Sequence, residues 1–435
     1  MIRTLLGLIK RPEHRATSKH LAAIYPFVAQ GGLGGRGALI GYDHSGGAFC
    51  YDPWVQYGKT ITGPNMIVMG IVGRAKSSLI KTYLYRQAVF GRRHLIIDPK
   101  GEYSPLARSL GCTPIVLKPG GDVRLNPLSS HAGLTSQLRL LVAVASGAIG
   151  RDLTPTEHTI CSNTLATFHA DGQPEATLPR VVDRLLDPSE QIAEAMQLSL
   201  RELLDASRDL AYGLGRLCDG DLAGMFDGET THGIDLAAPS LVLDLHHVVD
   251  SQAIGIIMVC AAAWLRAAIA AEAIEVDPAK RPNRILVFEE AWRVLANLAA
   301  AEWLVDSFKH SRSYGVQNIV VTHRISDLQA TGDDGSRVSR LTQGLIADAE
   351  TKVIYAQDKA ELEQAERLLG LTDTEAAELP NLPRGLALWI VGERSFLVRH
   401  VLAEHEVALV DTDARMRTTQ AHADPDPDPE LREAA

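Results

Sequence analysis

The fold of this chain can be inferred from one stretch, Met66-Ile67-Val68-Met69-Gly70-Ile71-Val72-Gly73-Arg74-Ala75-Lys76-Ser77-Ser78-Leu79-Ile80-Lys81. Its apolar start predicts a buried strand, and the spacing of Leu79 and Ile80 with the apolar residues that follow predicts a helix. Between the two lies a loop with glycines. Free backbone N–H groups at the start of a helix, together with the helix dipole, attract phosphate. The sequence therefore predicts an α/β protein with a phosphate-binding loop.

The loop matches the pattern G-x-x-x-x-G-K-[ST] from Gly70 to Ser77, with Ala75 in place of the last glycine. In this pattern Lys76 reaches the β- and γ-phosphates and the Ser77 hydroxyl binds Mg²⁺, so the expected cofactors are ATP and Mg²⁺. If Ala75 needs a left-handed backbone, the alanine costs roughly 1–2 kcal/mol. An ordinary strand-to-helix turn with a solvated lysine is the alternative. The predicted nucleotide contacts are Gly70, Gly73, Arg74, Ala75, Lys76, Ser77 and Ser78.

Composition narrows the class of protein. The 435 residues are 46% hydrophobic and 22% charged, which is typical of a globular protein. The net charge of −10 provides no overall basic field, so DNA would have to bind a local patch or an oligomer pore. The five cysteines include no C-x-x-C pair, which favours a reducing cytoplasm. The apolar piece near the N-terminus has no secretory pattern, and the run Ala253–Leu265 is too short to cross a membrane. If the protein works at a membrane, we therefore expect partner proteins to hold it at that membrane.

The order of strand-like and helical patterns predicts five segments. A β-hairpin is expected at Ala38–Tyr42 and Ala48–Tyr51, and buried strands at His94–Asp98 and Pro114–Leu117. After residue 135 the apolar spacing becomes helical, with expected helices at Leu138–Val144, His158–Phe168, Pro179–Leu186 and Gln191–Leu204. The predicted segments are an N-terminal extension (1–60), the first part of an ATPase domain (61–134), an all-helical insertion (135–239), the second part of the ATPase domain (240–417) and a disordered acidic tail (418–435).

A second chemical stretch runs from Arg284 to Trp292, where four apolar residues deliver Glu289 and Glu290 to a strand end. In phosphate-loop ATPases the first such carboxylate supports Mg²⁺ and the second polarises the attacking water. Glu289 stands where aspartate is usual. The strand Leu241–Asp244 is a rival because it too ends in a carboxylate, but it lacks the second acid.

Two further strand ends carry polar residues. Thr322 and His323 follow a predicted central strand and could sense a γ-phosphate, although a capped strand end explains them equally well. The segment Asp98–Tyr103 places two carboxylates and a lysine at the carboxyl end of a strand, where ligands of parallel sheets bind. A helix N-terminus with a capping aspartate is the alternative there.

Taken together, these stretches resemble the ATPase module of the VirB4/TraC-like conjugation and type IV secretion ATPases, within the HerA/FtsK group of RecA-like hexameric motors. The resemblance covers about residues 26–417 and implies a RecA-like P-loop NTPase fold with a mostly parallel central sheet. The residues that carry it are Gly70–Ser78, Asp98–Tyr103, Leu125–Leu128, Glu289–Trp292, Ser311–Gly315 and Thr322–Asp327.

The resemblance also implies roles. Arg312 matches an arginine that such motors present to the nucleotide of the neighbouring subunit. Arg384 is a second candidate for this role. A homo-hexamer is implied for that reason. The alternative is that Arg312 is an ordinary surface arginine at the end of a helix. Ala75, Glu289 and His323 depart from the common pattern, since many relatives carry glutamine at the position of His323. The N-terminal domain by which longer relatives dock on the channel is absent or reduced to the first ~60 residues.

The sequence thus predicts an ATP-hydrolysing motor that energises a conjugative or type IV secretion-like apparatus at the cytoplasmic face of a membrane, held there by channel components. One alternative is a DNA translocase of the HerA/FtsK kind that contacts DNA directly. The other is a nucleotide-gated scaffold that binds ATP but scarcely hydrolyses it, which the departures at Ala75 and Glu289 suggest.

Overall fold

A computed structural model describes residues 32–129, 133–169, 173–220, 222–251, 253–275, 281–295, 298–324 and 337–410. The predicted acidic tail, the N-terminal apolar piece and most of the polar loop at 331–339 lie outside these residues, as do Ser326 and Asp327.

One sheet of eleven strands organises the described part of the chain, in the order β2-β1-β11-β10-β9-β3-β8-β7-β4-β6-β5. From β9 to β5 all neighbours are parallel, and from β2 to β9 they are antiparallel. The predicted α/β class with a mostly parallel sheet is confirmed. The strands are β1 (Ala38–Asp43), β2 (Ala48–Tyr51), β3 (Met66–Met69), β4 (Arg93–Asp98), β5 (Ile115–Val116), β6 (Ser240–Asp244), β7 (Arg284–Phe288), β8 (Val316–Thr322), β9 (Thr351–Ile354), β10 (Leu386–Val391) and β11 (Arg394–His400).

Helices cover both faces of the sheet, because the central strands are apolar on both sides. The face covered by α3 (Lys76–Ala88) and α4 (Ser104–Ser109) forms one hydrophobic core. The opposite face packs against α10 (Ile254–Glu275) and α12 (Leu298–Tyr314) in a second core. The remaining helices of these layers are α2 (Pro53–Gln56), α11 (Trp292–Leu295), α13 (Arg337–Asp348), α14 (Leu362–Leu369), α15 (Asp373–Glu378) and α16 (Val407–Val410).

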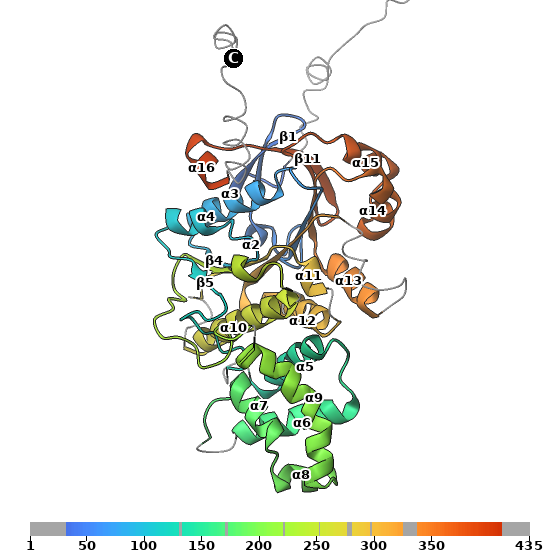
Figure 1. The fold of residues 1–435 in the computed structure, drawn as a ribbon. Coiled ribbons are helices and arrows are strands. Elements are labelled where there is room, and N and C mark those ends of the chain that lie inside the picture. Colours follow the sequence, from blue (N-terminus) through green and yellow to red (C-terminus); the bar gives the residue numbers. More distant parts are fainter. Residues whose placement is uncertain are drawn as a thin grey trace, which may run out of the picture.

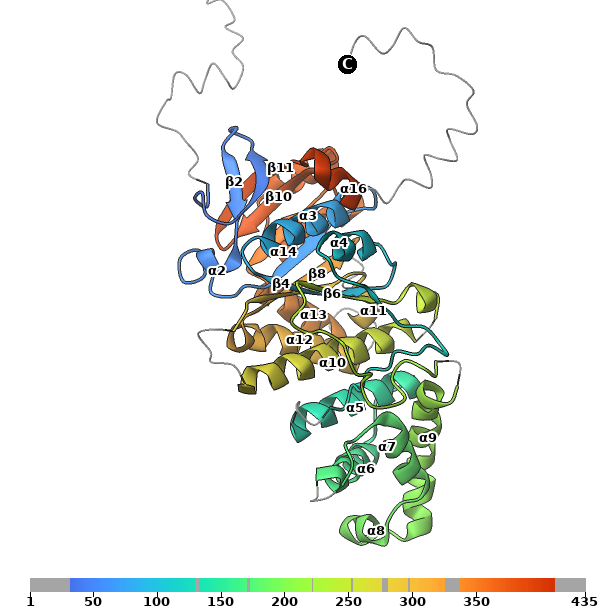
Figure 2. The same cartoon turned by 90° about the vertical axis from the view of Figure 1, so that its left-hand side faces the viewer.

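A separate helical lobe leaves the sheet after β5 and returns to it at β6 (Figures 1 and 2). It contains α5 (Leu134–Ile149), α6 (Pro155–Ala166), α7 (Leu178–Leu186), α8 (Glu190–Met196) and α9 (Leu200–Cys218). Helix α5 joins the lobe to the core, because its buried face contacts both α10 and α12.

The helix predicted at Gln191–Leu204 is wrong as one element, because the structure divides it into α8 and α9. Gln197 adopts a left-handed backbone (φ 57°), which ends α8. Ser199 and Glu202 then form a reciprocal capping box that starts α9. Helix α3 ends at Ala88, before Gly91, whose positive φ of 72° is typical of the turn that follows a helix.

The hairpin β1–β2 is an edge of the central sheet. It pairs with β11 through Gly41 and His400, residues far apart in the sequence. Added Cβ atoms at Gly41 would lie 1.9 Å from the Arg399 carbonyl oxygen, so only glycine allows this close approach. No helix within the described ranges is both long enough and apolar enough to cross a membrane.

Candidate nucleotide-binding site

The loop between β3 and α3 has the backbone that a phosphate cradle needs. Gly70 (φ 155°) packs against Tyr355, where a Cβ would come within 2.4 Å of the tyrosine Cβ. Gly73 has φ 79°. Ala75 is left-handed as well, with φ 80° and ψ 23°. The alanine therefore stands in the conformation that favours glycine, and the loop carries this strain.

The Lys76 ammonium is folded back onto its own loop. It donates to the Gly70 carbonyl, to the Ile71 carbonyl at 3.2 Å, and to Nδ1 of His323 at 3.0 Å. Lys76 is buried. These carbonyl oxygens hold the cation at the centre of the loop, which is the place that phosphate oxygens occupy in such loops.

One imidazole connects Lys76 to Glu290. Because an ammonium can only donate, Nδ1 of His323 must accept, so the ring proton lies on Nε2. That nitrogen donates to Glu290 Oε1 at 2.8 Å. Strand β8 lies between β3 and β7 in the sheet, and this order brings the three side chains into contact. One hydrogen-bonded chain thus joins Lys76, His323 and Glu290. Lys76 and His323 are more than two hundred positions apart in the sequence.

The Glu290 carboxylate accepts from three side chains. Its Oε1 also pairs with the Lys100 ammonium, and its Oε2 accepts from the Trp292 indole at 2.6 Å. Burial raises the pKa of Glu290, but the hydrogen bonds from His323, Lys100 and Trp292 outweigh burial and hold the pKa below its ordinary value. The residue has φ 52°, a left-handed conformation that is costly for a glutamate. Such strain is typical of functional positions.

Glu289 points the other way, toward the face covered by α3 and α4. The Tyr103 hydroxyl donates to its Oε1, and both side chains are buried. Burial raises the pKa of Glu289 to about 7, against the hydrogen bond from Tyr103 and with the help of the Asp98 and Glu290 charges. A buried carboxylate with a raised pKa gains from a nearby cation, which would restore its charge.

The segment Asp98–Tyr103 supplies partners for both glutamates, which sequence reasoning did not find. Asp98 accepts from the backbone N–H groups of Lys100 (3.2 Å), Gly101 (2.9 Å) and Tyr103 (2.8 Å), so it caps the turn after β4. The predicted helix cap is wrong, because the N-cap of α4 is Tyr103, which has no side-chain cap bond, and Asp98 caps the turn before it; the ligand-binding alternative stays a prediction. The aspartate is a structural cap, and the capped turn presents Lys100 to Glu290 and Tyr103 to Glu289.

Asp244, the rival to the paired glutamates, lies farther away. Four strand spacings separate β6 from β3, or about 19 Å, whereas two spacings of about 5 Å separate β7 from β3. The Asp244 carboxylate accepts from the backbone N–H and the Nδ1 of His246, at 3.0 and 2.8 Å. The topology therefore favours Glu289 and Glu290 over Asp244.

The structure separates Thr322 from His323. The Thr322 hydroxyl is buried without a hydrogen-bond partner, on the opposite side of β8 from His323 by strand alternation. Only His323 contacts Lys76.

The two arginine candidates lie at opposite ends of the strands. Arg312 is exposed near the end of α12, just before β8 begins, so the length of β8 separates it from the loop of its own chain by about 23 Å. Arg384 is close to that loop, because the N–H of Gly385 donates to the Arg74 carbonyl at 3.4 Å. The structure therefore groups Arg384, but not Arg312, with the phosphate loop of the same chain.

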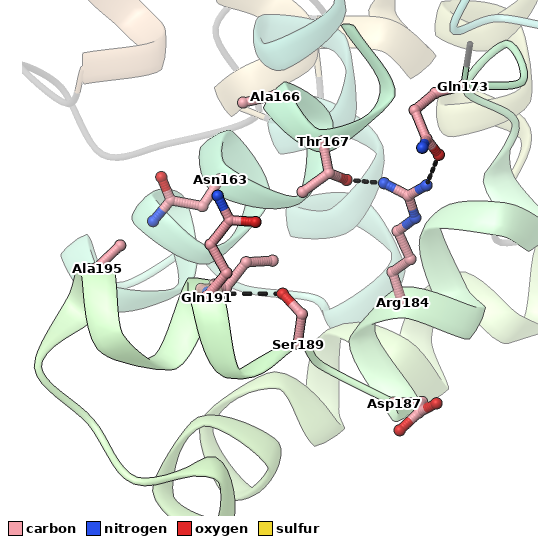
Figure 3. A pocket seen from close by; sticks show the side chains of 10 residues that line it. Asn163, Ala166, Thr167, Gln173, Arg184, Asp187, Ser189, Gln191 and Ala195 are labelled. Atoms are coloured by element: carbon pink, nitrogen blue, oxygen red, sulfur yellow. Dashed lines mark hydrogen bonds between the residues drawn. The ribbon is translucent and has the colours of Figure 1, made fainter. Parts of the chain in front are cut away.

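A pocket of about 550 Å³ lies in the helical lobe between α6, α7 and α8 (Figure 3). Arg184 donates there to Thr167 and to Gln173 Oε1 (2.8 Å), and its guanidinium lies 3.7 Å from the ring centroid of Phe168. These contacts tie Arg184 to the pocket wall. The pocket is remote in sequence from every predicted site residue.

Residues 271–384 match the family described as the TraG P-loop domain. The matched segment contains Glu289, Glu290, Arg312 and His323. Over these residues the chain is similar to the TraG P-loop domain. The phosphate loop at Gly70–Ser77 lies outside the matched residues, but the strand before it, β3, pairs with β8, which lies within them. No curated protein matches the sequence.

Solved structures share the fold over most of the chain. VirB4 of Thermoanaerobacter pseudethanolicus has a TM-score of 0.69 and 24% identity, covering 87% of this chain and 100% of that chain. The plasmid coupling protein TrwB in complex with ADP and Mg²⁺ has a TM-score of 0.59 and 15% identity, covering 89% and 93%. TrwB with the non-hydrolysable GTP analogue GDPNP has a TM-score of 0.55 and 18% identity, covering 78% and 86%. The predicted RecA-like P-loop NTPase fold is confirmed, as is the predicted resemblance of the fold to VirB4.

Proposed function

We propose that this chain is an ATP-hydrolysing motor that energises a conjugative or type IV secretion-like apparatus. The hydrogen-bonded chain from Lys76 through His323 to Glu290 carries the proposal, because it links the phosphate loop to a carboxylate placed to activate water. The match to the TraG P-loop domain and the fold shared with VirB4 support a role in such an apparatus.

The residues present fit ATP with Mg²⁺. Magnesium prefers oxygen ligands, and the Ser77 hydroxyl at the start of α3 and the Glu289 carboxylate at the end of β7 are both of this kind. The raised pKa of Glu289 fits a neighbouring cation, since burial otherwise disfavours its charge. When bound, the metal would neutralise charge on the β- and γ-phosphates.

The side chains of the site would act in sequence. Phosphate oxygens would replace the Gly70 and Ile71 carbonyls as acceptors of Lys76. His323 Nδ1 would then lose its donor. Binding of nucleotide to the loop would therefore change the hydrogen bonding of the imidazole whose Nε2 donates to Glu290. Glu290 would accept a proton from water as the water oxygen attacks the γ-phosphorus and the bond to the β–γ bridging oxygen breaks.

We further propose a ring of identical subunits, a homo-hexamer by resemblance, in which Arg312 serves the nucleotide of the next subunit. Arg312 lies at the end of the strands opposite the P-loop. This position favours contact with the nucleotide of another subunit over contact with the nucleotide of its own subunit. An arginine in trans neutralises charge on the transferring phosphoryl only when subunits meet. Channel components would hold the ring at the cytoplasmic face of the membrane, and we propose 135–239 as the helical insertion of this motor.

ATP turnover by purified variants tests the proposal. We expect Lys76→Ala and Glu290→Gln each to lower turnover by about 100-fold or more. Glu290→Gln keeps its affinity for ATP, because the Gln amide leaves the phosphate loop intact. Lys118→Ala, an exposed lysine after β5, serves as the control and keeps full activity. Full turnover in Lys76→Ala would contradict the site.

A DNA-translocating motor is the second candidate, favoured by the fold shared with the coupling protein TrwB. It predicts that DNA stimulates ATP turnover and that DNA binding weakens steeply with salt. Turnover that does not respond to DNA at any ionic strength would leave the first proposal in place.

A further inference from the structure

Glu290 has little acceptor capacity left for water. A carboxylate offers about four lone-pair positions, and three donors already occupy three of them. Lys100 and His323 share Oε1, and Trp292 takes one position on Oε2. The Glu290 side chain is also only 5% exposed. One position on Oε2 therefore remains for water, and the departure of a donor would open another position on this carboxylate.

Lys100 is the donor that can leave most easily. Trp292 is two residues from Glu290, and His323 is fixed at the end of a central strand. Lys100 instead reaches Glu290 from a turn at the surface, and its side chain is 43% exposed. It is also the only one of the three that always carries a full charge, so it responds most to an arriving triphosphate.

The turn that carries Lys100 has a fixed backbone and a mobile side chain. The Asp98 carboxylate accepts from the N–H groups of Lys100, Gly101 and Tyr103, which holds the main chain in place. The four-carbon stem of the lysine can still rotate its ammonium between partners. Glu102, two residues on, offers it a second carboxylate.

We propose that Lys100 is a positioning residue that occupies Glu290 in the nucleotide-free protein and releases it when bound triphosphate attracts the ammonium. The inference rests on the proposed function. It assigns the resting protein a base that Lys100 partly occupies, so that the binding of ATP frees Glu290 to accept a proton from water. The pair is partly exposed, and such ion pairs are worth at most about 1 kcal/mol, or about fivefold.

The test compares kcat and KM for ATP in the full-length wild type, Lys100→Met, Lys100→Arg and the control Lys118→Met. Methionine keeps the apolar stem and removes the charge. We expect kcat of Lys100→Met to rise about 1.5- to 5-fold with KM unchanged within about twofold, because the variant no longer holds Glu290. Lys100→Arg keeps a cation on Glu290 and turns over ATP no faster than wild type. Lys118→Met behaves as wild type.

Two outcomes overturn the inference while the proposed function stands. A lower kcat in Lys100→Met would mean that the ammonium assists hydrolysis, and an unchanged kcat would mean that the pair has no effect on the base. Failure of the proposed function looks different, because then neither wild type nor Lys100→Met hydrolyses ATP. A general structural role would lower the unfolding midpoint of Lys100→Met and leave no rise in kcat, which also counts against the inference.

Discussion

Replacing Ala75 with glycine should stabilise the protein, which is the reverse of the usual effect of this substitution. Ala75 has φ 80° and ψ 23°, where an L-residue with a Cβ pays roughly 1–2 kcal/mol and glycine pays almost nothing. Glycine also gives the unfolded chain more freedom, which costs about 0.5–1 kcal/mol. The difference leaves Ala75→Gly more stable by about 0.5–1 kcal/mol.

Ala88→Gly is the matched control. Ala88 is the last residue of the same helix, α3, and the same chemical change there carries only the entropic cost. It should therefore destabilise the protein by about 0.5–1 kcal/mol. The same mutation thus has opposite signs at the two ends of one helix.

Urea unfolding followed by tryptophan fluorescence measures the difference. The five tryptophans, Trp54, Trp264, Trp292, Trp303 and Trp389, all lie outside 134–218, so they report on the part of the chain that contains α3. Affinity for ATP should stay within about twofold, since the loop has the left-handed shape before nucleotide arrives. Ala75→Gly that loses stability to the same extent as Ala88→Gly would refute the left-handed assignment.

Two further predictions concern pH and assembly. His94 is fully buried with both ring nitrogens unpartnered, and burial lowers its pKa to about 3. Because the unfolded histidine has a pKa near 6.5, the unfolded state takes up a proton that the folded state refuses as pH falls below 6.5. Between pH 7 and 5 the wild type should therefore lose about 2 kcal/mol more unfolding free energy than His94→Leu, measured by urea titration at each pH. Parallel pH dependence of the two proteins would contradict this. Arg312→Ala should keep ATP binding and lose about 10³-fold in turnover, and mixing it with inactive Lys76→Ala should restore activity, because each supplies what the other lacks across a subunit contact. Mixtures that remain inactive would argue against action in trans.

The local elements of this protein could be read from the amino-acid sequence. The run Met66–Met69 is apolar throughout, the loop keeps glycines at Gly70 and Gly73, and Glu289 and Glu290 end a buried strand. Such features depend on neighbours along the chain, so the strand, loop, helix and paired acids could be predicted without a structure. The α/β class followed from their order, and the boundary between α8 and α9 was missed because apolar periodicity continues through the break at Gln197.

The contacts between these elements could be seen only in the folded chain. The order β3-β8-β7-β4 places His323 between Lys76 and Glu290 and brings Lys100 and Tyr103 to the two glutamates. The same order places Asp244 away from the phosphate loop. No spacing in the sequence encodes these contacts, because strand order in a sheet depends on how the helical crossovers pack, and each crossover sums many weak interactions between distant residues. The backbone angle of Ala75 was left open for the same reason, since the whole loop, held to Tyr355 and Gly385, sets it.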